Sequence, residues 1–264
     1  PVYYIKSAFK GKFGTFLAGF FSVAIILALG FMGNMVQSNS IGDSFQNAFG
    51  INRLVVGVFV AVVAAFIFLG GVKRIAWFTE KIVPLMAVFY IVGCLVILFM
   101  NGAGVGKAFH DIFVMAFAPQ SVAGGALGIT VQKAMRFGVA RGLFSNEAGM
   151  GSAPNAAATA DVSHPAKQGL VQMLAVFIDT LLICSATALM CLCSGVVPTT
   201  EAAGAPYVQA ALQTALGDFG PVFIAVSMAL FAFTTLIGNY YYCEGCLRFI
   251  FKRIPSHNFM TGFR

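Results

Sequence analysis

One carboxylate lies deep inside an apolar stretch of the sequence. Asp179 is flanked by apolar residues on both sides, from Leu174 to Ile183. A charged side chain at the centre of a membrane-spanning helix costs about 2.5–3.5 kcal/mol to insert, so a partner must offset that cost. Two interpretations stay open: Asp179 binds or relays a transported cation or proton, or it forms a structural pair with Arg136 or Arg141.

A second segment interrupts a hydrophobic stretch with residues that break helices. It is the run Arg-Gly-Leu-Phe-Ser-Asn-Glu-Ala-Gly-Met-Gly-Ser-Ala-Pro-Asn, residues 141–155. In lipid, broken helix is tolerated only where it packs against protein or lines a cavity, and its exposed ends suit a carboxylate and a cation. The run therefore predicts a discontinuous helix. A cytoplasmic loop followed by a helix that begins near Ala153 is the alternative.

Neutral polar side chains occur in two further apolar segments. Asn34 and Gln37 lie near the end of the first segment, and amides suit a zwitterion because they bind it without leaving a net charge. Gln37 is the deeper of the two and the better ligand candidate. Thr234 and Thr235 can offer oxygen ligands to a small hard cation, although such hydroxyls more often bond the carbonyl four residues earlier.

Six segments are long and apolar enough to position these residues across a membrane, since a spanning helix needs about 20 such residues. They are residues 13–40, 54–72, 84–100, 123–160 (broken), 168–195 and 219–251. The fold class predicted is an all-α integral membrane protein, with residues 1–264 forming a single transmembrane domain. A short helix at the membrane surface is expected within residues 202–217.

The composition agrees with that class. Hydrophobic residues make up 59% of the 264 residues and charged residues only 9%, against about 25% in a soluble domain. The net charge of +7 comes from Lys and Arg at helix ends rather than from a nucleic-acid surface. These basic residues gather on one side, which predicts a cytoplasmic N-terminus in the cell inner (plasma) membrane. The first residue is Pro, and an internal segment of a longer protein is expected.

No pattern in the sequence predicts catalysis or a bound cofactor. There is no HExxH motif and no glycine-rich phosphate loop, so an enzyme is not expected. Cys243 and Cys246 have the spacing of a metal motif but stand alone in an apolar stretch, so buried thiols are favoured over metal ligands.

At these residues the sequence resembles the alanine/glycine:cation symporter family. The resemblance rests on Pro-Val-Tyr-Tyr-Ile at residues 1–5, on Gly-Asn-Met-Val-Gln at residues 33–37 and, most distinctively, on residues 141–154. It extends over essentially the whole chain. It implies part of a five-plus-five inverted-repeat transporter bundle, of which this chain supplies the third to eighth core helices.

The resemblance also implies which residues bind. Its broken sixth core helix corresponds to residues 144–149, and its eighth supplies sodium-binding hydroxyls, which map onto Thr234 and Thr235. Asn239 stands where the family often has Trp. The substrate site predicted on this basis consists of Gln37, Asn34, Phe144, Ser145, Asn146, Gly149 and Asn239. The cation or coupling site consists of Thr234, Thr235 and Asp179.

The function expected is symport of Na⁺, or of a proton, with alanine or glycine by alternating access. The partners are the small neutral amino acid, the cation and the lipid bilayer, without nucleic acid. A passive facilitator or channel would share the hydropathy but not the ion coupling. A structural membrane subunit would tolerate loss of Asp179 and Gln37.

Overall fold

The computed structural model describes residues 1–100, 102–116, 150–197, 199, 203–251 and 263, with isolated positions between 132 and 142. Every regular element in these residues is helical, as the composition predicts. Four of the described helices are long and apolar enough to cross a membrane: Gly11–Phe49, Arg74–Met100, Pro165–Cys193 and Phe219–Phe251. Six spans remain a prediction, because most of 123–160 lies outside the described residues and the helix at 53–69 is shorter.

The N-terminal half consists of three long helical stretches. The first contains α2 (Gly11–Ile25), the π-helix η1 (Ile26–Gly33) and α3 (Asn34–Phe49), and it follows the short α1 (Val2–Ala8). Gly50 ends α3 in the left-handed region, with φ of 70°. The chain then turns into α4 (Arg53–Leu69) and α5 (Gly71–Met100).

Helix α5 differs from the segment predicted at 84–100, because it begins well before Pro84. Proline has no backbone N–H and therefore removes one bond of the helix ladder. Proline is nevertheless tolerated within membrane helices, where neighbouring groups satisfy the freed carbonyl. The basic residues Arg74 and Lys81 lie within this helix, before Pro84.

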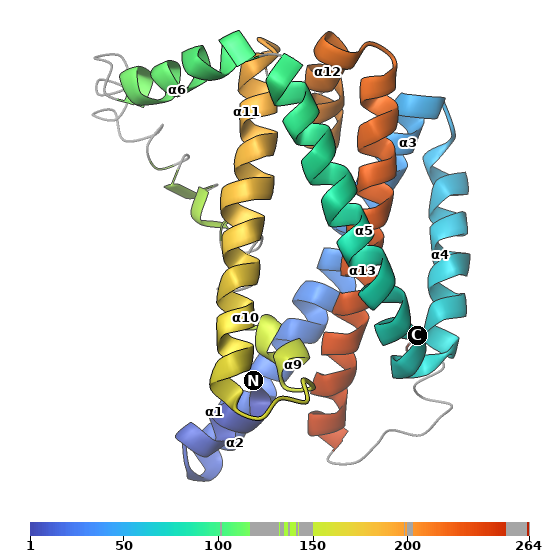
Figure 1. Ribbon diagram of the computed structural model, residues 1–264. Coiled ribbons are helices and arrows are strands. Elements are labelled where there is room, and N and C mark those ends of the chain that lie inside the picture. The colour runs from blue at the N-terminus through green and yellow to red at the C-terminus, as the bar shows by residue number, and fades with distance from the viewer. Residues whose placement is uncertain are drawn as a thin grey trace.

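After α5 the chain forms a helix that was not predicted. Helix α6 (Gly102–Ala116) lies crosswise at one end of the bundle (Figure 1). Its first turns contain three glycines, and because glycine has a low helix propensity the sequence does not predict a helix there. The remaining described elements are α9 (Ala153–Ala157), α10 (Pro165–Phe177), the π-helix η2 (Ile178–Cys184), α11 (Ser185–Cys193), α12 (Ala205–Leu216) and α13 (Phe219–Phe251).

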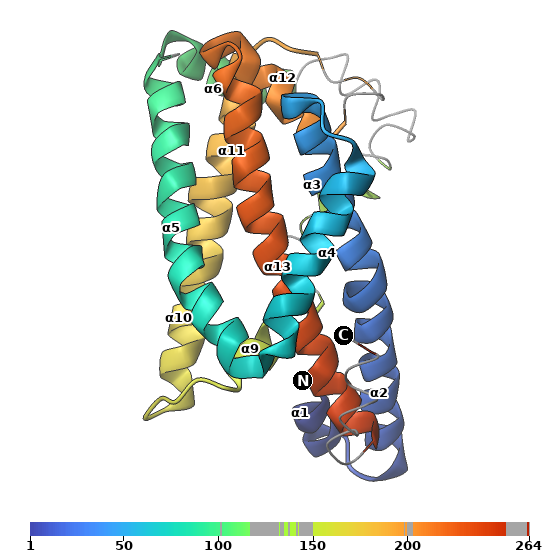
Figure 2. The same ribbon diagram turned by 90° about the vertical axis from the view of Figure 1, so that its right-hand side faces the viewer.

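Helix α13 is the centre of the described bundle. It has 33 residues, which corresponds to about 50 Å at 1.5 Å per residue. Figures 1 and 2 show it running between α5 on one side and α3 and α4 on the other. Its buried residues take part in three apolar clusters of the described structure. The first joins α13 to α4 and α5, the second joins it to α11 and α12, and the third joins it to α2 and η1.

Candidate functional site

Two of the predicted substrate residues meet directly at the middle of the bundle. Asn239 on α13 is 1% exposed, and its Nδ2 donates to Oδ1 of Asn34 over 2.9 Å. Asn34 in turn donates from Nδ2 to the carbonyl of Gly30, 3.2 Å away. The structure therefore joins residues 205 positions apart in the sequence through one amide pair.

Glycines on η1 allow α13 to approach this pair. A Cβ on Gly33 would lie 3.2 Å from Nδ2 of Asn239, and one on Gly30 would lie 3.0 Å from Sγ of Cys243. Small residues at a helix contact permit such close backbone approach in membranes. The Gly-x-x-Gly spacing at 30–33 is the sequence signal that could have predicted this contact.

The π-helical geometry of η1 was also missed. It ends at Gly33, directly before Asn34. Short π-helical stretches occur frequently at functional sites, where they shift the register of a helix surface. Aliphatic residues and glycine in this stretch give no sequence signal for a change of helix type.

Gln37 lies one turn after Asn34 on α3 and is half-buried. Residues three apart on a helix lie on one face, so both amides belong to the same side of α3. Within the described part of the chain, the side chain of Gln37 makes no hydrogen bond. No described group competes with a ligand for its amide.

The two threonines bond their own helix, as the general tendency predicts. Thr234 donates to the carbonyl of Leu230 or Phe231, each 3.0 Å away, and Thr235 donates to that of Phe231 over 2.9 Å. Each hydroxyl has one proton, so only lone pairs remain for a further partner. Thr234 is buried against Sδ of Met86, whereas Thr235 is half-buried and lies one turn before Asn239. Thr235 is thus the one that shares a helix face with the amide pair.

Asp179 lies in η2, the second π-helical stretch, and is half-buried. Its helix stands at the side of the bundle (Figure 1), where η2 packs against α5. The described contacts place Asp179 on a different helix pair from Asn34 and Asn239, so its role in coupling remains a prediction.

The broken run is described only at its end. Phe144, Ser145, Asn146 and Gly149 lie outside the described residues, as does Arg141. Gly151 has φ of 65°, and α9 begins at Ala153, where the alternative placed a helix start. The backbone turn at Gly151 fits both a discontinuous helix and a loop.

The cysteines expected as buried thiols are buried. Cys243 and Cys246 are each 0% exposed and pack in the cluster between α13 and α2. Among the described residues, no group of three or more His, Cys, Asp or Glu side chains is arranged to hold a metal ion.

One charged pair on α13 was not anticipated. Glu244 is 7% exposed and accepts a 2.6 Å bond from Arg248, one turn further along. An acid and a base four residues apart in an apolar helix are a usable signal, because charges within membrane helices pair with each other.

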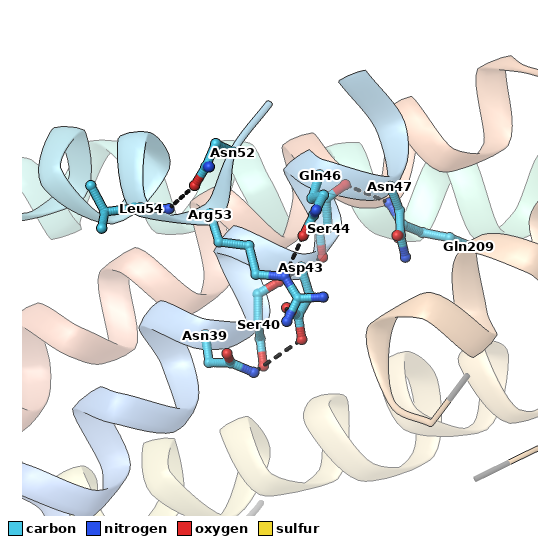
Figure 3. A network of polar contacts seen from close by, with 10 residues as sticks. All are labelled: Asn39, Ser40, Asp43, Ser44, Gln46, Asn47, Asn52, Arg53, Leu54 and Gln209. Atoms are coloured by element: carbon cyan, nitrogen blue, oxygen red, sulfur yellow. Dashed lines mark hydrogen bonds and ion pairs between the residues drawn. The ribbon is translucent and has the colours of Figure 1, made fainter. Parts of the chain in front are cut away.

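A polar network holds the end of the bundle opposite α1 (Figure 3). Gln209 of α12 is 2% exposed and donates to the carbonyls of Ser44 and Pro221 over 2.9 and 3.0 Å. Its Oε1 accepts from Asn47, 3.3 Å away. The helix expected within residues 202–217 is therefore present as α12 and is fastened to both α3 and α13.

The adjoining turn between α3 and α4 contains an ion pair. Arg53 lies 2.9 Å from Asp43 and also bonds Gln46, while Asp43 accepts from Asn39 over 3.0 Å. Asn52 caps α4 by accepting from the amide of Leu54 at 2.8 Å. These contacts fix the turn between α3 and α4. The charged groups that take part in them, Arg53 and Asp43, form no contact with the Asn34–Asn239 pair in the described structure.

A bundle of long apolar helices whose central member presents an amide and hydroxyls to its neighbours fits the class of membrane transporters. The sequence matches the sodium:alanine symporter family over residues 1–263, and the chain belongs to that family. The family resemblance inferred from residues 1–5, 33–37 and 141–154 is thereby confirmed, and the members are transporters rather than enzymes.

Curated relatives cover nearly the whole chain. The amino-acid carrier protein AlsT of Bacillus subtilis is 44% identical over 250 residues, which are 95% of this chain and 52% of that protein. The putative sodium/proton-dependent alanine carrier protein YrbD of the same organism is 42% identical, covering 100% of this chain and 56% of its own length. The probable sodium/glutamine symporter GlnT is 44% identical, with 96% and 51% covered. The chain spans about half the length of the curated relatives it matches.

Proposed function

We propose that this chain forms the central part of a sodium-coupled symporter of a small neutral amino acid, alanine or glycine, that works by alternating access. The observation that supports this most directly is the Asn34–Asn239 amide pair at the centre of the bundle, with Gln37 one turn away. Uncharged donors and acceptors suit a zwitterion, and the family and its relatives supply the class of transport.

Thr235 is the best-placed cation ligand of this site. Its proton is engaged by the carbonyl of Phe231, so the oxygen offers lone pairs, as a hard cation requires. It lies on the face of α13 that presents Asn239, which would bring ion and substrate together. Thr234 would contribute from the side that faces α5, and Asp179 would balance the charge of the cation during the cycle.

Coupling to sodium supplies enough free energy for accumulation. Moving one charge through 100 mV contributes about 2.3 kcal/mol, which sustains roughly a forty-fold gradient of a neutral substrate. A zwitterion adds no net charge, so the coupled ion alone determines the electrical contribution.

Uptake of labelled alanine by the full-length protein in liposomes tests the proposal. An inward sodium gradient should drive accumulation, and replacing sodium by choline should abolish it. Accumulation driven by a pH gradient without sodium would establish the proton-coupled alternative. Equilibration that ignores both gradients would establish a passive facilitator.

Two substitutions test the residues. Thr235→Ala should raise the sodium concentration for half-maximal uptake by about ten-fold, the equivalent of one lost ligand contact. Ser227→Ala is the matched control, because Ser227 is also buried on α13 and bonded to the carbonyl four residues earlier, 2.8 Å away. Gln37→Ala should raise the KM for alanine, with the exposed Gln213→Ala as its control. Equal effects of site and control variants would refute the assignment.

A further inference from the structure

A large groove in the described structure lies outside the candidate site. It has a volume of about 990 Å³ and runs along α2, between α1 and the end of α13. Figure 2 shows these three segments together at the end of the bundle where the N-terminus lies. Among the described residues, none of those proposed to bind amino acid or cation lines it.

The two ends of this groove differ in polarity. Tyr3, Lys6 and Arg248 line the end beside α1. Phe16, Gly19 and Phe20 line the part that follows α2 into the apolar span, and the two phenylalanines are 69% and 65% exposed. The groove is thus cationic at one end and apolar along the rest. One leaflet of a membrane has the same polarity, with a polar surface above a hydrocarbon interior.

The cationic end retains an unbalanced positive charge. Arg248 is paired with Glu244 at 2.6 Å, so these two charges cancel. Lys6 is exposed and forms no ion pair within the described residues. Lys10 and Lys12 follow shortly after it, and they add to the positive potential at this end. An anionic group is therefore favoured at this end of the groove. The electrostatic attraction is strongest for an anionic group that is partly shielded from water.

The apolar part of the groove is notched and can hold a narrow apolar chain. A Cβ on Gly19 would meet nothing within 4 Å, so this glycine leaves a notch between Phe16 and Phe20. Tyr3 packs edge-on against Phe249 with ring centroids 5.6 Å apart, and both residues line the groove together with Lys6. Aromatic residues of this kind are enriched at the membrane interface.

We propose that this groove binds one anionic phospholipid. The phosphate and acidic headgroup lie at Lys6 beside Tyr3, and an acyl chain lies along Phe16, the notch at Gly19 and Phe20. Charge complementarity selects an acidic headgroup over a zwitterionic one, since basic pockets between membrane helices bind acidic headgroups. The site is independent of the proposed transport cycle.

The test uses the full-length protein purified from membranes that contain phosphatidylglycerol and phosphatidylcholine, with bound lipid counted by native mass spectrometry. The wild type should retain phosphatidylglycerol in preference to phosphatidylcholine. Gly19→Leu should fill the notch, and Lys6→Gln should remove the charge, so each should lower bound phosphatidylglycerol roughly five-fold.

Each variant has a matched control. Gly57→Leu adds the same side chain at a glycine of α4 that also has nothing within 4 Å, and Lys107→Gln removes an exposed charge of α6, outside the groove. Both should bind lipid as the wild type does. Equal retention of the two lipids, or equal loss in variant and control, would overturn the proposal.

Discussion

Helix α13 and the helix formed by α10, η2 and α11 are similar in length and apolar character, yet they occupy opposite kinds of position. Buried residues occur along the whole of α13, from Gly220 to Leu247. Neither α10 nor η2 contains a buried residue among those described. Both helices bear predicted site residues, Asn239 on the first and Asp179 on the second. Hydropathy identifies membrane helices, but it does not distinguish the central helix from a peripheral one.

The difference comes from the neighbours. Glycines on the helices around α13 lie where a Cβ would collide with it: Gly93 of α5 would place one 2.3 Å from Cζ of Phe223, and Gly33 would crowd Asn239. Gly169 on α10 has nothing within 4 Å. Close approach in a membrane depends on small residues at the contact, so the helix that glycines face becomes the centre.

The largest effect should come from the peripheral helix. Asp179→Asn should lower sodium-driven uptake by about two orders of magnitude, because a carboxylate within a span is retained for function. It should change the thermal midpoint little, since the surrounding residues of η2 are not buried. Uptake and thermal unfolding of the full-length protein are the measurements.

Asp161→Asn is the control for this change, because Asp161 is exposed before α10. An Asp179→Asn protein that transports normally would reduce Asp179 to a structural residue. One that no longer folds would show that its helix is as tightly packed in the full protein as α13 is here.

The second effect concerns the central helix. A Cβ on Gly220 would lie 2.6 Å from the carbonyl carbon of Leu212, and backbone cannot move aside as a side chain can. Gly220→Ala should therefore destabilise the contact between α12 and α13 by about 1–3 kcal/mol. Lower thermal stability in detergent is the expected result.

Gly238→Ala on the same helix sharpens the comparison. A Cβ there meets nothing within 4 Å in the described structure, so stability should stay the same or rise slightly with helix propensity. A loss as large as that of Gly220→Ala would show that another helix of the full-length protein packs on this stripe of α13.

Sequence reasoning predicted long helices better than the contacts between them. The segment 219–251 coincides with α13, because its ends are marked by Gly217, Asp218 and the basic residues after Phe251. Asn34 and Asn239 were each named as binding residues, but nothing in a single sequence shows that they bond each other. Helix type at η1 and η2, and the burial of Glu244, depend on packing between distant segments and are not encoded in local composition.

A smaller effect is expected for the amide pair. Replacing Asn34 and Asn239 by Ala singly and together forms a double-mutant cycle, and the coupling free energy should be about 0.6–2 kcal/mol, as for other interhelical hydrogen bonds in membranes. Thermal unfolding of the four proteins measures it. A coupling near zero would mean that apolar packing alone positions α13 against α3, and the substrate site would then need another explanation for its buried amides.

The smallest effect should come from the exposed end of the bundle. Arg53 is 59% exposed and Asp43 is 20% exposed, so their ion pair is screened and should contribute less than about 1 kcal/mol. Arg53→Gln should therefore shift the thermal midpoint little, and added salt should reduce even that shift. Gln209→Leu is the contrasting change at the same end, because it leaves the carbonyls of Ser44 and Pro221 and the amide of Asn47 without their partner. If Arg53→Gln proved the more damaging of the two, surface charge rather than buried hydrogen bonding would be the main stabilising interaction at this end of the bundle.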